Sequence, residues 1–204
     1  TAVGNAALQA NTTGTPNTAV GFEALDANTT GGQNTGIGVG SFGANTTASK
    51  NTGLGYASGL SNTTGANNTA LGHSALCTNT TGATNTAVGA FALKLNTTAS
   101  DGVAVGRNAL CQNTSGAANT AVGNSSMQCN QTGTKNVAIG RDSGKILTTG
   151  NGNVYVGYAN SANGTNTSNE IVIGCQVTSI GSNYFTFGKG SSSDRVYNQF
   201  TSNA

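Results

Sequence analysis

The chain has 204 residues, among them 32 Thr, 31 Gly and 28 Asn, whereas only 7% are charged and Trp is absent. No ordinary globular core has this composition, and a net charge of +2 is lower than soluble disordered chains usually carry. Basic residues are scattered singly, and the apolar runs are far shorter than the ~18 residues of a membrane span. The sequence therefore predicts neither nucleic-acid binding nor a membrane span.

A glycine recurs every 17 residues from Gly4 to Gly174, and an aliphatic residue precedes each copy. One period reads NTAVGFEALDANTTGGQ over residues 17–33. A unit this short cannot bury a core alone, so the period predicts an all-β chain folded as a parallel β-solenoid, or β-roll, of 17-residue coils. Residues 1–174 are predicted to form its shaft of ten periods, and residues 175–204 an irregular C-terminal tip or junction. Because the chain begins inside a repeat, we expect an upstream segment before it.

The predicted strand of each coil contains a Thr and an aliphatic residue two positions apart, such as Thr18 and Val20, which share one strand face. We expect this face, which includes Val88 in a later coil, to lie in the solenoid interior. The column between them is nearly always Ala or Gly, as at Ala19, and is expected to be covered by self-association. Glycines at the strand end and in NTTG are predicted to adopt positive φ in turns.

The second half of each coil contains a bulky column, represented by Leu25, and then an Asn-Thr-Thr turn. This turn matches the acceptor pattern for N-glycosylation. A stacked ladder of Asn and Thr side chains that satisfies the backbone groups of the turns is the favoured interpretation.

The position after each strand glycine is the bulkiest and most variable of the repeat. Aromatic, His and Arg side chains there would suit stacking on sugar faces and hydrogen bonding to hydroxyls or acidic groups. The alternative is that they pack between subunits or cover the rod. The candidate receptor-binding stripe consists of Phe22, Tyr56, His73, Arg107, Arg141 and Tyr158.

Residues that could carry chemistry are few. Glu23 and Asp26 are the only acids that share a coil, and His73 is the only histidine, so we expect no enzyme activity, no metal site and no cofactor.

Four cysteines are expected to be free thiols. Cys77 and Cys111 are two coils apart, which is too far for a disulfide. The distance between Cys111 and Cys129 permits a disulfide. The cysteines are Cys77, Cys111, Cys129 and Cys175.

The NTAVG segments and NVAIG at residues 136–140 resemble the NSVAIG-type repeat of YadA-like head domains. These domains are found in trimeric autotransporter adhesins and in many phage tail fibres. The resemblance covers residues 1 to about 174 and implies a left-handed β-roll, a homotrimer and a role in binding surfaces.

Residues 188–204 contain no further repeat. They resemble the junction between the shaft of a phage tail fibre and a C-terminal intramolecular chaperone that cleaves itself off. This implies that Ala204 is a processed C-terminus. We expect the segment to make mostly interchain contacts, with Tyr197 and Phe200 near the three-fold axis.

We therefore expect a non-catalytic shaft of a phage tail fibre, extracellular on the virion and joined to an upstream tail or anchor protein. Its partner would be a host cell-surface glycan or an outer-membrane receptor. The alternative is the head of a trimeric autotransporter adhesin on the bacterial cell surface. Less favoured are an ice-binding solenoid that uses Thr12 and Thr13, and a polysaccharide-degrading tailspike.

Overall fold

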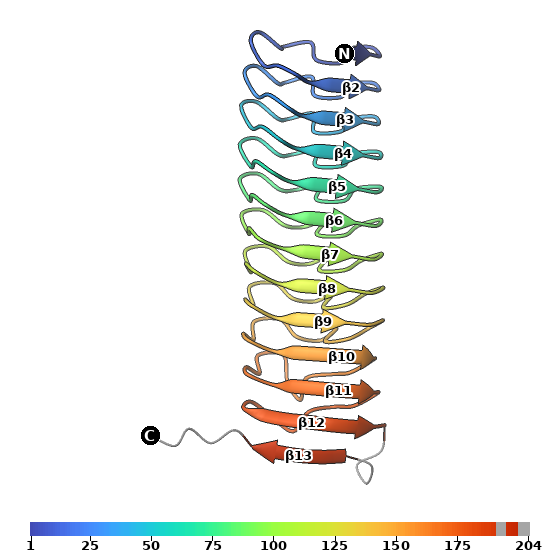
Figure 1. Cartoon of the computed structure of the whole chain (residues 1–204), viewed down its shortest axis with the longest axis vertical. Helices are drawn as coiled ribbons and strands as arrows, with labels where there is room; N and C mark the ends of the chain where they lie inside the picture. The colour runs from blue at the N-terminus through green and yellow to red at the C-terminus, as the bar shows by residue number, and fades with distance from the viewer. Residues whose placement is uncertain (191–194, 200–204) are drawn as a thin grey trace, which may run out of the picture.

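The computed structural model of the chain describes residues 1–190 and 195–199. All 13 strands belong to one sheet whose spatial order follows the chain order, and Figure 1 shows the coils stacked into a single rod. Neighbouring strands pair in parallel from β1 to β12, which confirms the predicted all-β parallel solenoid. The strands of the shaft are β1 (Ala2–Val3), β2 (Thr18–Val20), β3 (Thr35–Ile37), β4 (Thr52–Leu54), β5 (Thr69–Leu71), β6 (Thr86–Val88), β7 (Val103–Val105), β8 (Thr120–Val122), β9 (Val137–Ile139), β10 (Val154–Tyr158) and β11 (Ile171–Cys175).

The regular register ends at β11. Paired residues are 17 apart along the shaft, but β12 (Tyr184–Lys189) pairs with β11 at a step of 14, with Gly188 opposite Gly174. β13 (Arg195–Gln199) then runs antiparallel to β12. The last strand thus covers the edge of β12 within the same chain.

Residues 196–199 of β13 are open to solvent, and Tyr197 is 37% exposed. Its placement near a three-fold axis stays a prediction. Phe200 and Ala204 lie outside the described residues, so the expectations for them stay predictions as well.

The interior face of the strands is the small column, and this corrects the prediction from the sequence. Ala87 is fully buried, while Thr86 and Val88 on either side of it are half-buried. In five other coils the aliphatic residue is 36–57% exposed, at Val3, Ile37, Leu54, Val122 and Ile139. The column of Val88 therefore faces outward, and the small column is covered by the chain itself.

The thin coil explains why small residues take the interior face. A Cβ at Gly36 would lie 3.0 Å from the carbonyl oxygen of Ser41 and 3.2 Å from Cγ of Leu25, so little space remains between strand and ladder. The bulky column lies opposite, in a segment that forms turns and no second strand. This column is buried at Leu25, Phe42, Leu76, Leu93, Leu110 and Met127.

Departures from the repeat compensate one another in size. A Cβ at Gly59 would lie 2.4 Å from the ring of Phe42, and one at Gly144 would lie 2.8 Å from the ring of Tyr155. Both aromatic side chains are fully buried. Phe42 therefore fills the space that a glycine in the next coil leaves free, and Tyr155 fills the space that a glycine in the previous coil leaves free.

Left-handed backbone occurs at several positions of each coil. Strand-end glycines such as Gly21 have φ near +131°, as predicted, and Glu23 and Leu25 follow at 53° and 51°. The glycine of NTTG is different, because Gly31 is not among the residues with positive φ. A Cβ there would instead lie 2.2 Å from the carbonyl oxygen of Ala48, so close approach of the next coil favours glycine at this position.

Asparagine side chains form a continuous ladder inside the rod, which confirms the favoured interpretation of the NTT turns. The amide of Asn28 donates to Oδ1 of Asn11 at 2.8 Å and to the carbonyl of Gly31 at 3.0 Å. The same pattern recurs as far as Asn130. Thr hydroxyls extend it, because Thr29 donates to the next coil's backbone at 3.1 Å. These buried amides hold neighbouring coils in register.

Replacing Asn79 with Ala should destabilise the rod by about 1–3 kcal/mol, because buried partners lose their hydrogen bonds. The Asn79 amide donates to Asn62 and Gly82, and its oxygen accepts from Asn96. Urea denaturation of both proteins measures the change. Thr81→Ala, at an exposed site in the same turn, is the control and should change stability by less than ~0.5 kcal/mol. Equal effects at the two sites would contradict the importance of the ladder.

Candidate functional site

The candidate stripe lies on one corner of the rod, directly after the strand ends. Parallel register with a step of 17 places the residue after each strand glycine above the same residue of the previous coil. This corner follows the arrowheads of the strands in Figure 1. All six predicted residues are exposed there: Phe22, Tyr56, His73, Arg107, Arg141 and Tyr158.

The middle of the corner carries a continuous stack of rings. Tyr56 and His73 are stacked, with centroids 5.2 Å apart and an angle of 15° between the planes. The edge of His73 meets Phe91 at 5.2 Å, with an interplanar angle of 75°. The ammonium of Lys94 lies 5.3 Å from the centre of the Phe91 ring, within cation–π range. Three coils thus contribute one aromatic surface that ends in a cation.

A second cluster lies nearer the C-terminal end. Arg141 sits over the ring of Tyr158 at 5.7 Å. Its guanidinium also pairs with Asp142 at 3.1 Å, and Lys145 pairs with the same carboxylate at 3.2 Å. The carboxylate therefore offsets part of the positive charge of this cluster.

The structure brings together only some of the predicted residues. Tyr56 contacts His73, and Arg141 contacts Tyr158, whereas Phe22 and Arg107 make no ring contact with a described residue. The sequence pattern did not indicate Phe91 and Lys94, because they lie outside the column directly after the strand glycines. The available signal was Ala90, a small residue at the stripe position with a Phe directly after it.

The four cysteines are free thiols and half-buried, as predicted. Burial raises the pKa of the Cys77 and Cys111 thiols, and the nearby Lys94 ammonium opposes this shift by favouring the thiolate. The neighbouring Cys129 adds to the rise at Cys111. Both thiols are therefore protonated and weakly nucleophilic at neutral pH.

Alkylation of Cys77 and Cys111 by iodoacetamide at neutral pH should be slower in the folded protein than in the denatured one. The raised pKa means that the thiolate becomes abundant only above the ordinary value of 9.0, so the rate should climb with pH beyond that point. Mass spectrometry of the two peptides measures the rates. Lys94→Gln should slow both reactions further, and faster alkylation in that variant would contradict the role of the ammonium.

A buried polar cluster lies inside the C-terminal coils. The carboxylate of Glu170, fully buried, accepts hydrogen bonds from the hydroxyls of Tyr155, at 2.6 Å, and Ser179. Burial, together with the neighbouring carboxylate, raises the pKa of Tyr155 above its usual range, so its hydroxyl remains a donor. Glu170 stands in the column of the Asn that precedes each strand, such as Asn136 and Asn153, and its backbone NH still donates to Oδ1 of Asn153. This cluster joins coils and is closed to substrates.

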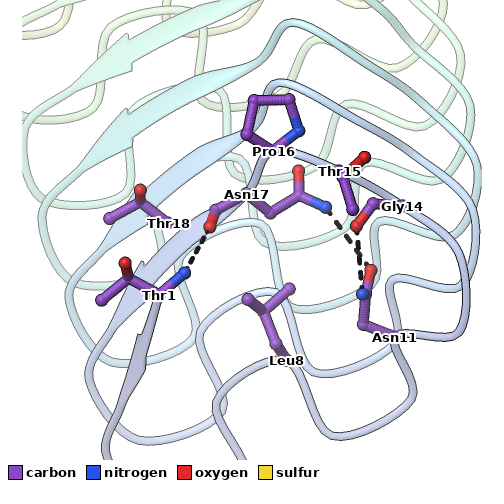
Figure 2. A pocket seen from close by; sticks show the side chains of 8 residues that line it. All are labelled: Thr1, Leu8, Asn11, Gly14, Thr15, Pro16, Asn17 and Thr18. Atoms are coloured by element: carbon purple, nitrogen blue, oxygen red, sulfur yellow. Dashed lines mark hydrogen bonds between the residues drawn. The ribbon is translucent and has the colours of Figure 1, made fainter.

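A hollow of about 420 Å³ lies at the first coil, and Figure 2 shows the residues that line it. Asn17 spans it, because its side-chain amide donates to Oδ1 of Asn11 at 3.4 Å and its backbone carbonyl accepts from the Thr1 amino group at 2.8 Å. Leu8 and Asn11 belong to columns that are buried between coils elsewhere in the rod. The hollow is therefore lined by the same columns that form the interior of the rod in later coils.

Comparison of the chain with protein-family models, curated proteins and solved structures found no match. Within the described residues, no helix is long and apolar enough to cross a membrane. The same residues contain no group of three or more His, Cys, Asp or Glu side chains that could hold a metal ion.

Proposed function

We propose that the chain is the non-catalytic shaft of a phage tail fibre, a left-handed homotrimer that attaches the virion to host cell-surface glycan. An upstream tail or anchor protein would join it to the particle. The observation that carries the proposal is an uncharged strand face of Thr and aliphatic side chains that runs along the whole shaft. The YadA-like pattern of NTAVG and NVAIG supplies the link to fibres and adhesins.

The outward strand face supports self-association. Strands β1 to β11 contain no charged residue, and their outward aliphatic side chains are half-buried or exposed in every coil. Long exposed apolar patches usually mark protein–protein interfaces. Another copy of the chain presents the same period, so a homotrimer would cover this face at every coil.

The exposed corner supports the adhesive role. It lies beside the strand face, so subunits that pack through their strands leave its rings and cations open to a ligand. The interior does not offer a site, because its polar groups are used in ladders between coils. A stiff rod with a lateral binding surface suits a fibre that must reach and hold a cell.

Two measurements test the proposal. Light scattering should give three times the chain mass of 20.0 kDa, and a monomer mass would contradict the homotrimer. Immunogold electron microscopy with an antibody against this chain should label tail fibres of phage particles. Labelling of bacterial cell surfaces without particles would contradict the fibre and favour the adhesin head.

A further inference from the structure

The middle of the corner is free of acidic residues. Between Asp26 and Asp142 no Asp or Glu occurs in the segments that follow the strand glycines, and Asp101 lies in another part of its coil. The same stretch contains His73, Lys94 and Arg107, three basic side chains in three successive coils.

We name these three residues, together with Tyr56 and Phe91, the cationic-aromatic patch. The ring stack joins four of them, from Tyr56 through His73 and Phe91 to Lys94. Arg107 stands in the coil after Phe91, where the backbone of Asn108 bonds to that of Ala90 at 3.0 Å. Neither Lys94 nor Arg107 forms an ion pair with a described residue.

We infer that the cationic-aromatic patch binds an acidic saccharide, one whose sugar rings carry carboxylates. This inference rests on the glycan attachment proposed above and names the class of glycan. The rings of Tyr56 and Phe91 would stack against the C–H face of a sugar, because a π face is electron-rich and attracts C–H bonds. Lys94 and Arg107 would donate charge-assisted hydrogen bonds to a carboxylate beside it.

The second cluster provides an internal comparison. Arg141 over Tyr158 repeats the pairing of a cation with a ring, but its charge is already engaged by Asp142 at 3.1 Å. A ligand carboxylate there would compete with, and be repelled by, the resident one. Selectivity for acidic sugars therefore belongs to the cationic-aromatic patch.

The test uses the whole chain and matched probes. Oligogalacturonate and polysialic acid are compared with their methyl esters, which keep the sugar backbone and remove the negative charge. At least one acid form should bind about tenfold more tightly than its ester, as expected for one charge-assisted hydrogen bond. The preference should weaken as salt is raised, because the patch is at the surface.

Three variants separate the two parts of the patch. Lys94→Gln should weaken the preference for acid, which Arg107 alone then supports, while leaving binding of the ester unchanged. Phe91→Ala should weaken acid and ester alike, by about tenfold, because stacking does not depend on charge. Lys135→Gln is the matched control, since this exposed cation lies in the turn before the next strand, and it should change neither affinity. Unchanged melting temperatures show that all three variants are folded.

The outcomes separate this inference from the proposed function. Equal binding of acids and esters would overturn the inference and leave glycan attachment supported. No binding to any acid or ester would contradict both. Equally tight, Lys94-dependent binding of polyglutamate or single-stranded DNA would overturn the inference, because it would make the patch a general site for polyanions.

Discussion

Replacing Ala87 with Asp should destabilise the fold by about 4 kcal/mol or more, because it buries a carboxylate without a partner in the narrowest part of the coil. Ala87 is fully buried in the cluster that contains Leu76 and Leu93. An ionised group there would force water into the rod or separate neighbouring coils. Circular dichroism during thermal unfolding should show a strongly lowered melting temperature or loss of the β spectrum.

The matched control is the same substitution one residue later. Val88→Asp places the charge on the outward face, where solvent reaches it, so the single chain should stay folded with a loss of about 1 kcal/mol. Its effect should appear in assembly, because the charge would lie in the proposed interface between subunits. Light scattering should then give a folded monomer. Equal unfolding by the two variants would show that the assignment of the faces is wrong, and a trimer formed by the Val88→Asp variant would show that subunits pack through another surface.

This pair of residues shows where sequence reasoning succeeded and where it failed. The unbroken spacing of 17 from Gly4 to Gly174 predicted the parallel stack, because each coil must repeat the backbone of the one before it. Alternation along β6 was equally readable, but alternation alone does not say which side faces inward. Hydrophobicity favoured Val88. The thin interior favours Ala87, and its width depends on the turn segment opposite, which the pattern of residues does not describe.

The candidate site was predictable to the same extent. An exact period places Tyr56 above His73 on one corner, and in the structure the two rings stack. Phe91 and Lys94 join them because side chains reach across columns, and their conformations depend on neighbours in three coils. The clusters around Arg141 and Lys94 both contain a cation over a ring. They differ because Asp142 forms two ion pairs in the first cluster, and this difference depends on side-chain conformations as well.

A single Gly59→Leu substitution should destabilise the rod by about 3 kcal/mol, because the new side chain meets the ring of Phe42. A Cβ at this site would lie 2.4 Å from Cε1 and 2.6 Å from Cζ of that ring. The backbone itself accepts Leu, since Gly59 has φ of 61° and Leu76 occupies the same column at 52°. Urea denaturation measures the loss, which is attributable to the ring.

Phe42→Leu should restore the double variant to within about 1 kcal/mol of the parent, because two Leu side chains then continue the ladder of the other coils. Alone, Phe42→Leu leaves a cavity beside Gly59 and should destabilise the rod by about 1–3 kcal/mol. Gly53 gives a weaker check, because a Cβ there would lie 2.4 Å from Oγ of Ser41 as well as 2.7 Å from Cδ2 of the same ring. Gly53→Ala should therefore destabilise the parent, and combination with Phe42→Leu should recover only the part of the loss that is due to the ring. Additive effects in both cycles would mean that the ring lies elsewhere. Coupling of about 2 kcal/mol or more would show that the Phe42 ring occupies the space that side chains at Gly53 and Gly59 would fill.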